Sequence, residues 1–205
     1  MTTAGLLLAA GAGRRMGRPK ALLRDGHDVP FVDRAVGMLL DSGCATVTVV
    51  LGAAADQARR LLDEAGWSCD PAVDVVVAED WEEGMGASLR RGLTALFEGS
   101  AEAALVMLVD LPDVHAGVLR RVLDTAHVPV RQALVRTTYA GRPGHPVLLG
   151  REHWAGVVST ARGDQGARAY LDAHPPEPCE CGDLAAGRDV DRPEDLPRGA
   201  APGRG

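Results

Sequence analysis

The sequence predicts an α/β fold with a mostly parallel central sheet, and three observations support this prediction. Short aliphatic and β-branched runs alternate with segments whose apolar residues recur every three or four positions. The strand-like runs are apolar almost throughout, as is typical of parallel strands buried on both faces. Glycines or acidic residues directly follow several of these runs, where ligands bind in open α/β sheets.

The individual elements follow from the same patterns. The first strand is the apolar run that ends before Gly11, and further strands are expected at 45–51, 73–78, 103–109, 133–138 and 146–149. Helices are expected from 30–32 to 41–43, at 56–64, around the apolar positions of 89–96, at 114–123, 152–158 and 166–173. We expect Asp113 to cap the helix that follows the fourth of these strands.

Composition narrows the class of protein. The chain has 205 residues, 46% of them hydrophobic but only 3% aromatic, which suffices for one mainly aliphatic core. A net charge of −6 argues against general nucleic-acid binding. No basic residue precedes the first apolar run and no run approaches membrane-spanning length, so we expect a cytoplasmic protein without a membrane partner. The patternless residues 197–205 are expected to be disordered.

Glycines and basic residues are concentrated after the first strand: Gly11, Gly13 and Gly17 with Arg14, Arg15, Arg18 and Lys20. Glycines allow positive φ and bring backbone N–H groups close to a ligand, while the cations match phosphate oxygens. This pattern predicts a loop that binds an anionic ligand, most simply a nucleotide. The alternative, a glycine turn whose basic residues face water, is disfavoured by four cations around three glycines.

Two better-known glycine loops do not fit. A Walker loop needs Gly-Lys-Ser/Thr in succession, whereas two residues separate Gly17 from Lys20 and Ala21 stands where the hydroxyl belongs. A dinucleotide fingerprint needs G-x-G-x-x-G and an acidic residue closing the second strand. Here the spacing is G-x-G-x-x-x-G and the second strand ends at Leu51 and Gly52.

Asp110 closes an apolar strand, where an unpaired carboxylate would be costly unless a cation compensates it. Beside nucleotide phosphates, the natural cation is Mg²⁺, which prefers one or two carboxylates together with phosphate oxygens. The alternative is that Asp110 caps the helix after Pro112, a role for which Asp113 is the better placed residue.

The string from Leu8 to Lys20 resembles the signature of the MobA-like nucleotidyltransferases, L-A-[AG]-G-x-[SG]-x-R-M-G-x-x-K. This resemblance implies a Rossmann-like three-layer nucleotidyltransferase fold with a mostly parallel sheet. It also implies that the loop wraps an NTP, with Lys20, Arg15 and the Mg²⁺ ligand Asp110 as catalytic residues. Ala-Ala-Gly after the leucine is associated with cytidine nucleotides and favours CTP. The nucleotide-binding residues it implies here are Leu8, Ala9, Ala10, Gly11, Gly13, Arg14 and Lys20.

Residues 84–89 resemble the family segment G-M-[GS]-x-S-L, which adds Gly84, Met85 and Ser88 to the nucleotide site. A glycine turn capped by Ser88 is the simpler alternative. Many relatives carry Asn after the third strand, whereas this chain has Glu79, so no base contact is assigned to that position.

Motifs in the second half resemble the branch of the family that cytidylylates the molybdenum cofactor. Residues 141–146 resemble G-x-x-G-H-P, and 163–168 resemble G-D-x-G-A-R. They imply an acceptor site that includes Gly144, His145, Asp164 and Arg168. Without the resemblance, a histidine beside proline is more often a packed loop residue.

The acidic stretch 189–196 resembles the family's D-[IV]-D-T-P-E-D-L, with Arg192 in place of threonine. It implies a second metal ligand, Asp189 or Asp191, of which we favour Asp191. Alternatively, the motif forms the start of a helix, with Asp191 as its N-cap and Pro193 in its first turn.

Together these motifs imply one nucleotidyltransferase domain over 1–196, with a nucleotide-binding half at about 1–112 and an acceptor-binding half at 113–196. The implied reaction is Mg²⁺-dependent transfer of CMP from CTP to the terminal phosphate of molybdopterin. A recipient molybdoenzyme or its chaperone is an expected partner, and nucleic acid is not. Two alternatives stay open: a sister transferase that uses GTP or another phosphorylated acceptor, and a non-catalytic chaperone that binds the molybdenum cofactor.

Overall fold

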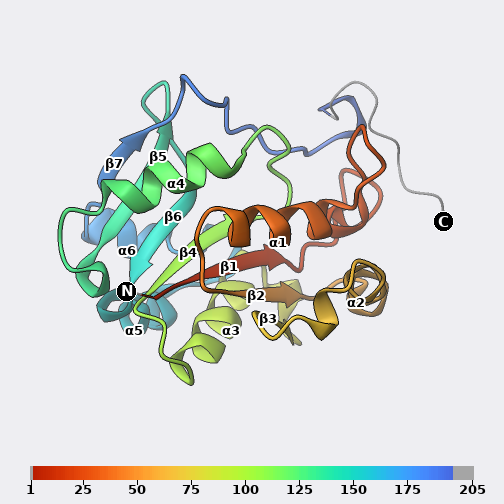
Figure 1. Cartoon of the computed structure of the whole chain (residues 1–205), viewed down its shortest axis with the longest axis horizontal. Helices are drawn as coiled ribbons and strands as arrows, with labels where there is room; N and C mark the ends of the chain where they lie inside the picture. The colour runs from red at the N-terminus through yellow and green to blue at the C-terminus, as the bar shows by residue number, and fades with distance from the viewer. Residues whose placement is uncertain (1, 196–205) are drawn as a thin grey trace.

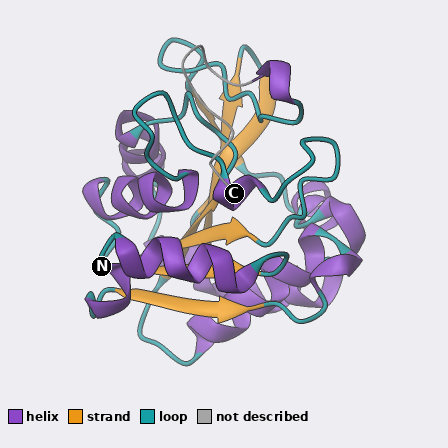
Figure 2. Ribbon diagram, turned by 90° about the vertical axis from the view of Figure 1, so that its right-hand side faces the viewer, coloured by secondary structure: helices purple, strands orange, loops and turns teal. Residues whose placement is uncertain are grey.

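The computed structural model describes residues 2–195, and the strands of this region form one seven-stranded sheet (Figure 1). The strands are β1 Thr3–Ala9, β2 Thr46–Leu51, β3 Val73–Val77, β4 Ala103–Leu108, β5 Leu134–Tyr139, β6 Arg142–Gly150 and β7 Glu177–Glu180. Their order across the sheet is β3-β2-β1-β4-β6-β5-β7. The strands twist strongly relative to one another, running steeply in the upper part of Figure 2 and nearly level in the lower part.

The sheet is mostly parallel, as the sequence predicts. β1 pairs in parallel with both β2 and β4, and β2 does so with β3. β6 is the exception, because it runs antiparallel to β4 and β5. The carboxyl ends of β1 to β4 therefore share one edge of the sheet, and β6 begins at that same edge.

Helices cover both faces of the sheet and complete the three layers. They are α1 Phe31–Asp41, α2 Ala55–Glu64, α3 Met85–Phe97, α4 Ala116–Thr125, α5 Arg151–Thr160 and α6 Arg168–Ala173. Buried residues of α1, α2 and α4 form one aliphatic core with one face of the sheet. Those of α3, α5 and α6 form a second core on the other face. This arrangement confirms the predicted α/β fold.

Two details differ from the sequence-based expectations. The cap of α4 is His115, whose Nδ1 accepts a hydrogen bond from the Gly117 N–H at 3.2 Å, so the assignment of this cap to Asp113 was wrong. β7 was not predicted, because its four residues, Glu-Pro-Cys-Glu, show no strand pattern and pair only through β5. The expected disordered tail, 197–205, lies outside the described residues.

Between residues 2 and 195, no helix has the length and apolar character that a membrane-spanning segment needs.

Candidate active site

A cleft of about 500 Å³ lies at the edge of the sheet where β1 and β4 end. The loop after β1, the start of α3 and the residue that follows β4 line it. It brings together thirteen of the predicted site residues: Leu8, Ala10, Gly11, Gly13, Arg14, Arg15, Lys20, Gly84, Met85, Ser88, Asp110, Asp164 and Asp191. Ala9 is not among the lining residues, because it is buried in the core that α1, α2 and α4 form with one face of the sheet.

The loop after β1 needs glycine at two of its positions. Gly13 has φ +59° and Gly17 has φ +78°, a backbone region that other L residues rarely adopt. At Gly13 a side chain would also collide with the carbonyl oxygen of Arg18. The loop therefore turns back on itself tightly, which leaves Gly11, Arg14 and Arg15 along the cleft.

Lys20 is the centre of the charged groups in the cleft. Its Nζ lies 2.6 Å from Asp110 Oδ2 and 2.6 Å from Asp191 Oδ1. Arg15 Nη1 lies 3.1 Å from the other oxygen of Asp191. Residues that are 171 positions apart in the sequence thus meet at one point.

The pKa values in this cluster reflect burial and mutual charge. Burial raises the pKa of Asp110 above its ordinary value, and the Lys20 charge offsets this only in part. Burial alone would lower the pKa of Lys20, but the carboxylates of Asp110 and Asp191 outweigh it and hold that pKa above its usual value. The hydrogen bond from Lys20 holds the pKa of Asp191 below its usual range. Lys20 is thus protonated at neutral pH and compensates the acidic cluster.

The acidic cluster fits a divalent cation. Asp110, Asp189 and Asp191 each offer a carboxylate oxygen, and these atoms all lie within 4.8 Å of one another. An all-oxygen donor set of this kind suits a hard cation such as Mg²⁺ or Mn²⁺. Sequence reasoning had to choose between Asp189 and Asp191, whereas the structure brings both to Asp110.

The start of α3 forms the opposite wall of the cleft. Gly84 directly precedes Met85, and the N-terminus of the helix has no side-chain hydrogen bond as its cap. Ser88 is therefore not the cap of this turn, and its buried side chain lines the cleft instead. Gly84 has φ +119°, and a side chain there would collide with Asp164. The two halves of the chain are thus in close contact at Gly84.

Gly144, His145 and Arg168, the other residues of the predicted acceptor site, are not among the lining residues of the cleft. Val106 of β4 pairs with Val147 of β6, so β6 brings Gly144 and His145 next to the end of β4. Burial lowers the pKa of His145 to about 4, and the nearby charge of Arg136 adds to this effect.

Sequence reasoning missed Arg136 on β5. Its Nε donates to the Gly144 carbonyl at 3.4 Å, and both burial and the neighbouring Arg168 lower its pKa. Arg136, His145 and Arg168 therefore form a basic group, here called the basic cluster, close to the end of β4. The sequence of β5, Leu-Val-Arg-Thr-Thr-Tyr, does not alternate cleanly between apolar and polar residues, so it carries no signal that would have pointed to Arg136.

Comparison with known protein families agrees with this geometry. The MobA-like NTP transferase domain matches residues 5–178. The chain belongs to the MobA-like NTP transferase family. This confirms the resemblance seen in the glycine-rich loop. Asp189 and Asp191 lie beyond the matched residues, so their assignment rests on the structure.

The relatives of this MobA-like chain are named for different activities. Nicotine blue oxidoreductase of Paenarthrobacter nicotinovorans is 36% identical over 204 residues, which cover 95% of this chain and 94% of that protein. A probable molybdenum cofactor guanylyltransferase of Mycobacterium ulcerans (strain Agy99) is 29% identical, with 99% and 96% covered.

Solved structures agree with the fold. Rv0371c from Mycobacterium tuberculosis H37Rv superimposes with a TM-score of 0.77 at 29% identity and covers 95% of each chain. A structure of the same protein in complex with manganese gives a TM-score of 0.64 at 27% identity, over 88% of this chain and 87% of that one.

Proposed function

We propose that this chain transfers a nucleotidyl group from an NTP to the terminal phosphate of a molybdopterin-type acceptor and releases pyrophosphate. The observation that carries the proposal is the contact between Lys20 and Asp110 in a cleft lined by the glycine-rich loop. Family membership supports a nucleotidyltransferase, and the names of the mycobacterial relatives support the molybdenum cofactor as acceptor.

The residues of the cleft divide into two tasks. Arg14, Arg15 and Lys20 would bind the triphosphate, since cations and free loop N–H groups match phosphate oxygens. A phosphate monoester acceptor is already ionised at neutral pH, so its oxygen can attack without a general base. Catalysis then rests on alignment of the two substrates and on neutralisation of charge at the α-phosphate and the leaving pyrophosphate.

Asp110, Asp189 and Asp191 would hold a divalent cation, which we take to be Mg²⁺. When bound there, the ion would neutralise developing charge on phosphate oxygens. Lys20 lies among the same carboxylates, so its ammonium group is positioned to face both the ion and the phosphates. Rv0371c, a structurally similar protein, has been solved in complex with manganese, which supports a metal site here.

The acceptor would lie across Asp164 and the basic cluster. Asp164 lines the cleft, and Arg136 of β5 and His145 of β6 belong to the basic cluster. The neutral His145 can donate or accept a hydrogen bond, and the guanidinium groups can bind carbonyl or anionic groups of the acceptor. In this scheme residues 1–112 bind the nucleotide and 113–196 the acceptor, as two halves of one domain. The product would pass to a recipient molybdoenzyme or its chaperone.

For the nucleotide we propose CTP. Ala10 lines the cleft, and its methyl group packs against Gly52, where any side chain would collide with both Ala10 and Trp81. The Ala-Ala-Gly run after Leu8, which the family resemblance associates with cytidine nucleotides, supports CTP. The relatives named guanylyltransferases favour GTP as the alternative.

The experiment that tests this proposal is mass spectrometry of the product formed from an equimolar NTP mixture, Mg²⁺ and isolated molybdopterin. We expect molybdopterin cytosine dinucleotide together with one equivalent of pyrophosphate. A guanine product would correct the nucleotide alone. Formation of no dinucleotide, despite cofactor binding, would favour the non-catalytic chaperone.

A second candidate function is that of an oxidoreductase, because the relative with 36% identity is named nicotine blue oxidoreductase. The acidic cluster beside Lys20 favours nucleotidyl transfer, since carboxylates that hold a divalent cation serve phosphate chemistry. Oxidation of NADH or NADPH by this chain in the presence of nicotine blue, at a rate above that of pyrophosphate release, would reverse this preference.

A further inference from the structure

The segment that brings two of the three carboxylates of the acidic cluster together has little regular structure of its own. After β7, residues 181–191 form only turns and irregular chain, yet they end with Asp189 and Asp191 beside Asp110. In Figure 1 this blue segment runs from β7 across the molecule toward the loop that follows β1. Contacts with other elements must therefore fix its position.

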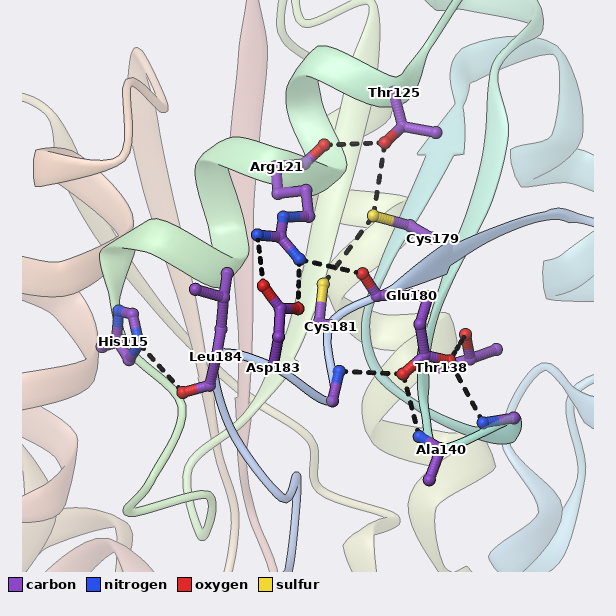
Figure 3. A network of polar contacts seen from close by, with 12 residues as sticks. His115, Arg121, Thr125, Thr138, Ala140, Cys179, Glu180, Cys181, Asp183 and Leu184 are labelled. Carbon is purple, nitrogen blue, oxygen red and sulfur yellow. Dashed lines mark hydrogen bonds and ion pairs between the residues drawn. The ribbon is translucent and has the colours of Figure 1, made fainter.

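Its first part is held by polar contacts with α4 and β5 (Figure 3). The Arg121 guanidinium of α4 binds the Asp183 carboxylate, with Nη2 and Oδ2 3.0 Å apart. His115 Nε2 lies 3.3 Å from the Leu184 carbonyl, and the Cys181 N–H donates to the Thr138 carbonyl at 2.8 Å. These contacts end five residues before Asp189.

Asp113 binds the part of the segment that directly precedes the metal ligands. Its Oδ2 accepts hydrogen bonds from the Ala186 N–H at 2.7 Å and from the Gly187 N–H at 3.0 Å. Gly187 has φ +60°, which lets the chain turn here toward Asp189.

Asp113 is itself firmly placed. Arg34 donates to the carbonyls of Pro112 and Val114, at 2.7 and 2.8 Å, and so fixes the backbone on both sides of it. The second carboxylate oxygen of Asp113 is buried and has no hydrogen-bond partner within residues 2–195. A buried carboxylate oxygen without a hydrogen-bond partner is costly. Capping of α4 does not explain the position of Asp113, because His115 is the cap of that helix.

The end of the segment, at Val190, is fixed as well. The Val190 N–H donates to the Asp110 carbonyl at 3.0 Å, and the Val190 side chain is buried in the core. Asp189 thus lies between an anchor at 186–187 and an anchor at Val190. Asp189 and Asp191 stand on either side of the buried Val190, which directs both carboxylates toward Asp110.

We propose that Asp113 is a positioning residue for the divalent-cation site: by binding the backbone of residues 186 and 187, it holds Asp189 and Asp191 against Asp110. This inference rests on the proposed metal-dependent transfer. Without Asp113 the glycine at 187 leaves the backbone free to move, and the two C-terminal ligands lose their fixed distance from Asp110. Residues that orient metal ligands affect metal affinity by about 10–100-fold.

The test is binding of Mn²⁺ alone to the full chain, measured by the electron paramagnetic resonance signal of the free ion. Asp113→Ala should weaken Mn²⁺ binding about tenfold or more. Asp113→Asn should stay within about threefold of wild type, because the amide oxygen can still accept both N–H groups. Asp183→Ala is the matched control, since it removes an ion pair of the same segment farther from the ligands, and it should leave the affinity unchanged.

Three results would overturn the inference. Equal affinity of Asp113→Ala and wild type would show that the anchor is not needed. Equal weakening by Asp113→Asn would show that the charge of Asp113 acts, rather than its hydrogen bonds. Equal weakening by Asp183→Ala would show a general effect of loosening the segment. If Asp113→Ala does not fold, Asp113→Ser takes its place and the same comparison decides. Absence of Mn²⁺ binding by wild type would refute the metal site of the proposed function itself, and this inference with it.

Discussion

The ammonium group of Lys20 lies 2.6 Å from a carboxylate oxygen of Asp110, although 90 positions separate the two residues. Both side chains are largely buried, with 17% of Lys20 and 11% of Asp110 exposed. A buried carboxylate needs a cation close by, and Lys20 provides it from the loop that would bind the phosphates. This contact links the glycine-rich loop to the acidic cluster of the proposed site.

Replacement of Lys20 should remove the cation that links loop and carboxylates. Lys20→Ala is expected to lower pyrophosphate release by about 100-fold or more, the scale seen when one charge-stabilising donor is removed from a transition state. The change also leaves the buried Asp110 without its cation and should lower stability, so the rate is measured at a temperature at which the variant is folded. Initial rates, with thermal unfolding as the control for folding, check this. Activity within a few-fold of wild type would contradict the role of Lys20.

Ala10 should determine part of the nucleotide preference. Ala10→Gly removes the methyl group that packs on Gly52 and should shift the ratio of CTP to GTP turnover several-fold toward GTP. The melting temperature of each variant in Mg²⁺ with either nucleotide, together with turnover, measures this shift. An unchanged ratio would show that the base is selected elsewhere in the cleft.

Arg136 should act on the acceptor and not on the nucleotide. Arg136→Ala is expected to raise the KM for molybdopterin about tenfold and to leave the KM for the NTP unchanged, because Arg136 lies in the basic cluster beside β4. Arg131→Ala is a suitable control, since Arg131 lies in the short helix before β5 and outside that cluster. A change in the KM for the NTP would place Arg136 in a different role.

Glu180 should add to stability in mildly acidic solution. Hydrogen bonds from Gly141, Thr138, Gly182 and Ala140 lower its pKa from 4.5 to about 2. Because its pKa is lower in the folded chain than in the unfolded one, the ionised carboxylate stabilises the fold above pH 4.5, and this contribution is lost as the pH falls toward 2.

The measurement for Glu180 is urea unfolding of wild type and Glu180→Gln between pH 7 and pH 2. The difference in unfolding free energy between the two proteins should be constant above pH 5 and should shrink below pH 4.5. A difference that does not change with pH would mean that the pKa of Glu180 is the same in the folded and the unfolded chain, which would contradict the prediction.

Much of the cleft could be predicted from the sequence because the signals for its residues are local. The strand-to-loop transition, the glycines and Lys20 lie within one short stretch, and Asp110 directly follows an apolar run. The twofold alternation of a strand also explains why Leu8 and Ala10 line the cleft whereas Ala9 faces the opposite core.

The rest depends on pairing between distant segments. Arg136 approaches Gly144 only through the register of β5 and β6, and β7 exists only because β5 lies beside it. Asp113 resembles a helix cap in the sequence, but its partners are backbone N–H groups 73 and 74 positions away. Local patterns carry no information about such contacts, so Asp113 was wrongly assigned as the cap of α4.

The most direct test of the central claim is pyrophosphate release from CTP, Mg²⁺ and molybdopterin by wild type and by Asp110→Asn. The change keeps the shape of the side chain but removes the charge that faces Lys20 and the proposed cation. We predict release of one pyrophosphate per dinucleotide by wild type and a loss of about 100-fold or more in the variant. Equal rates for both proteins, or no release by wild type with any NTP, would contradict the account.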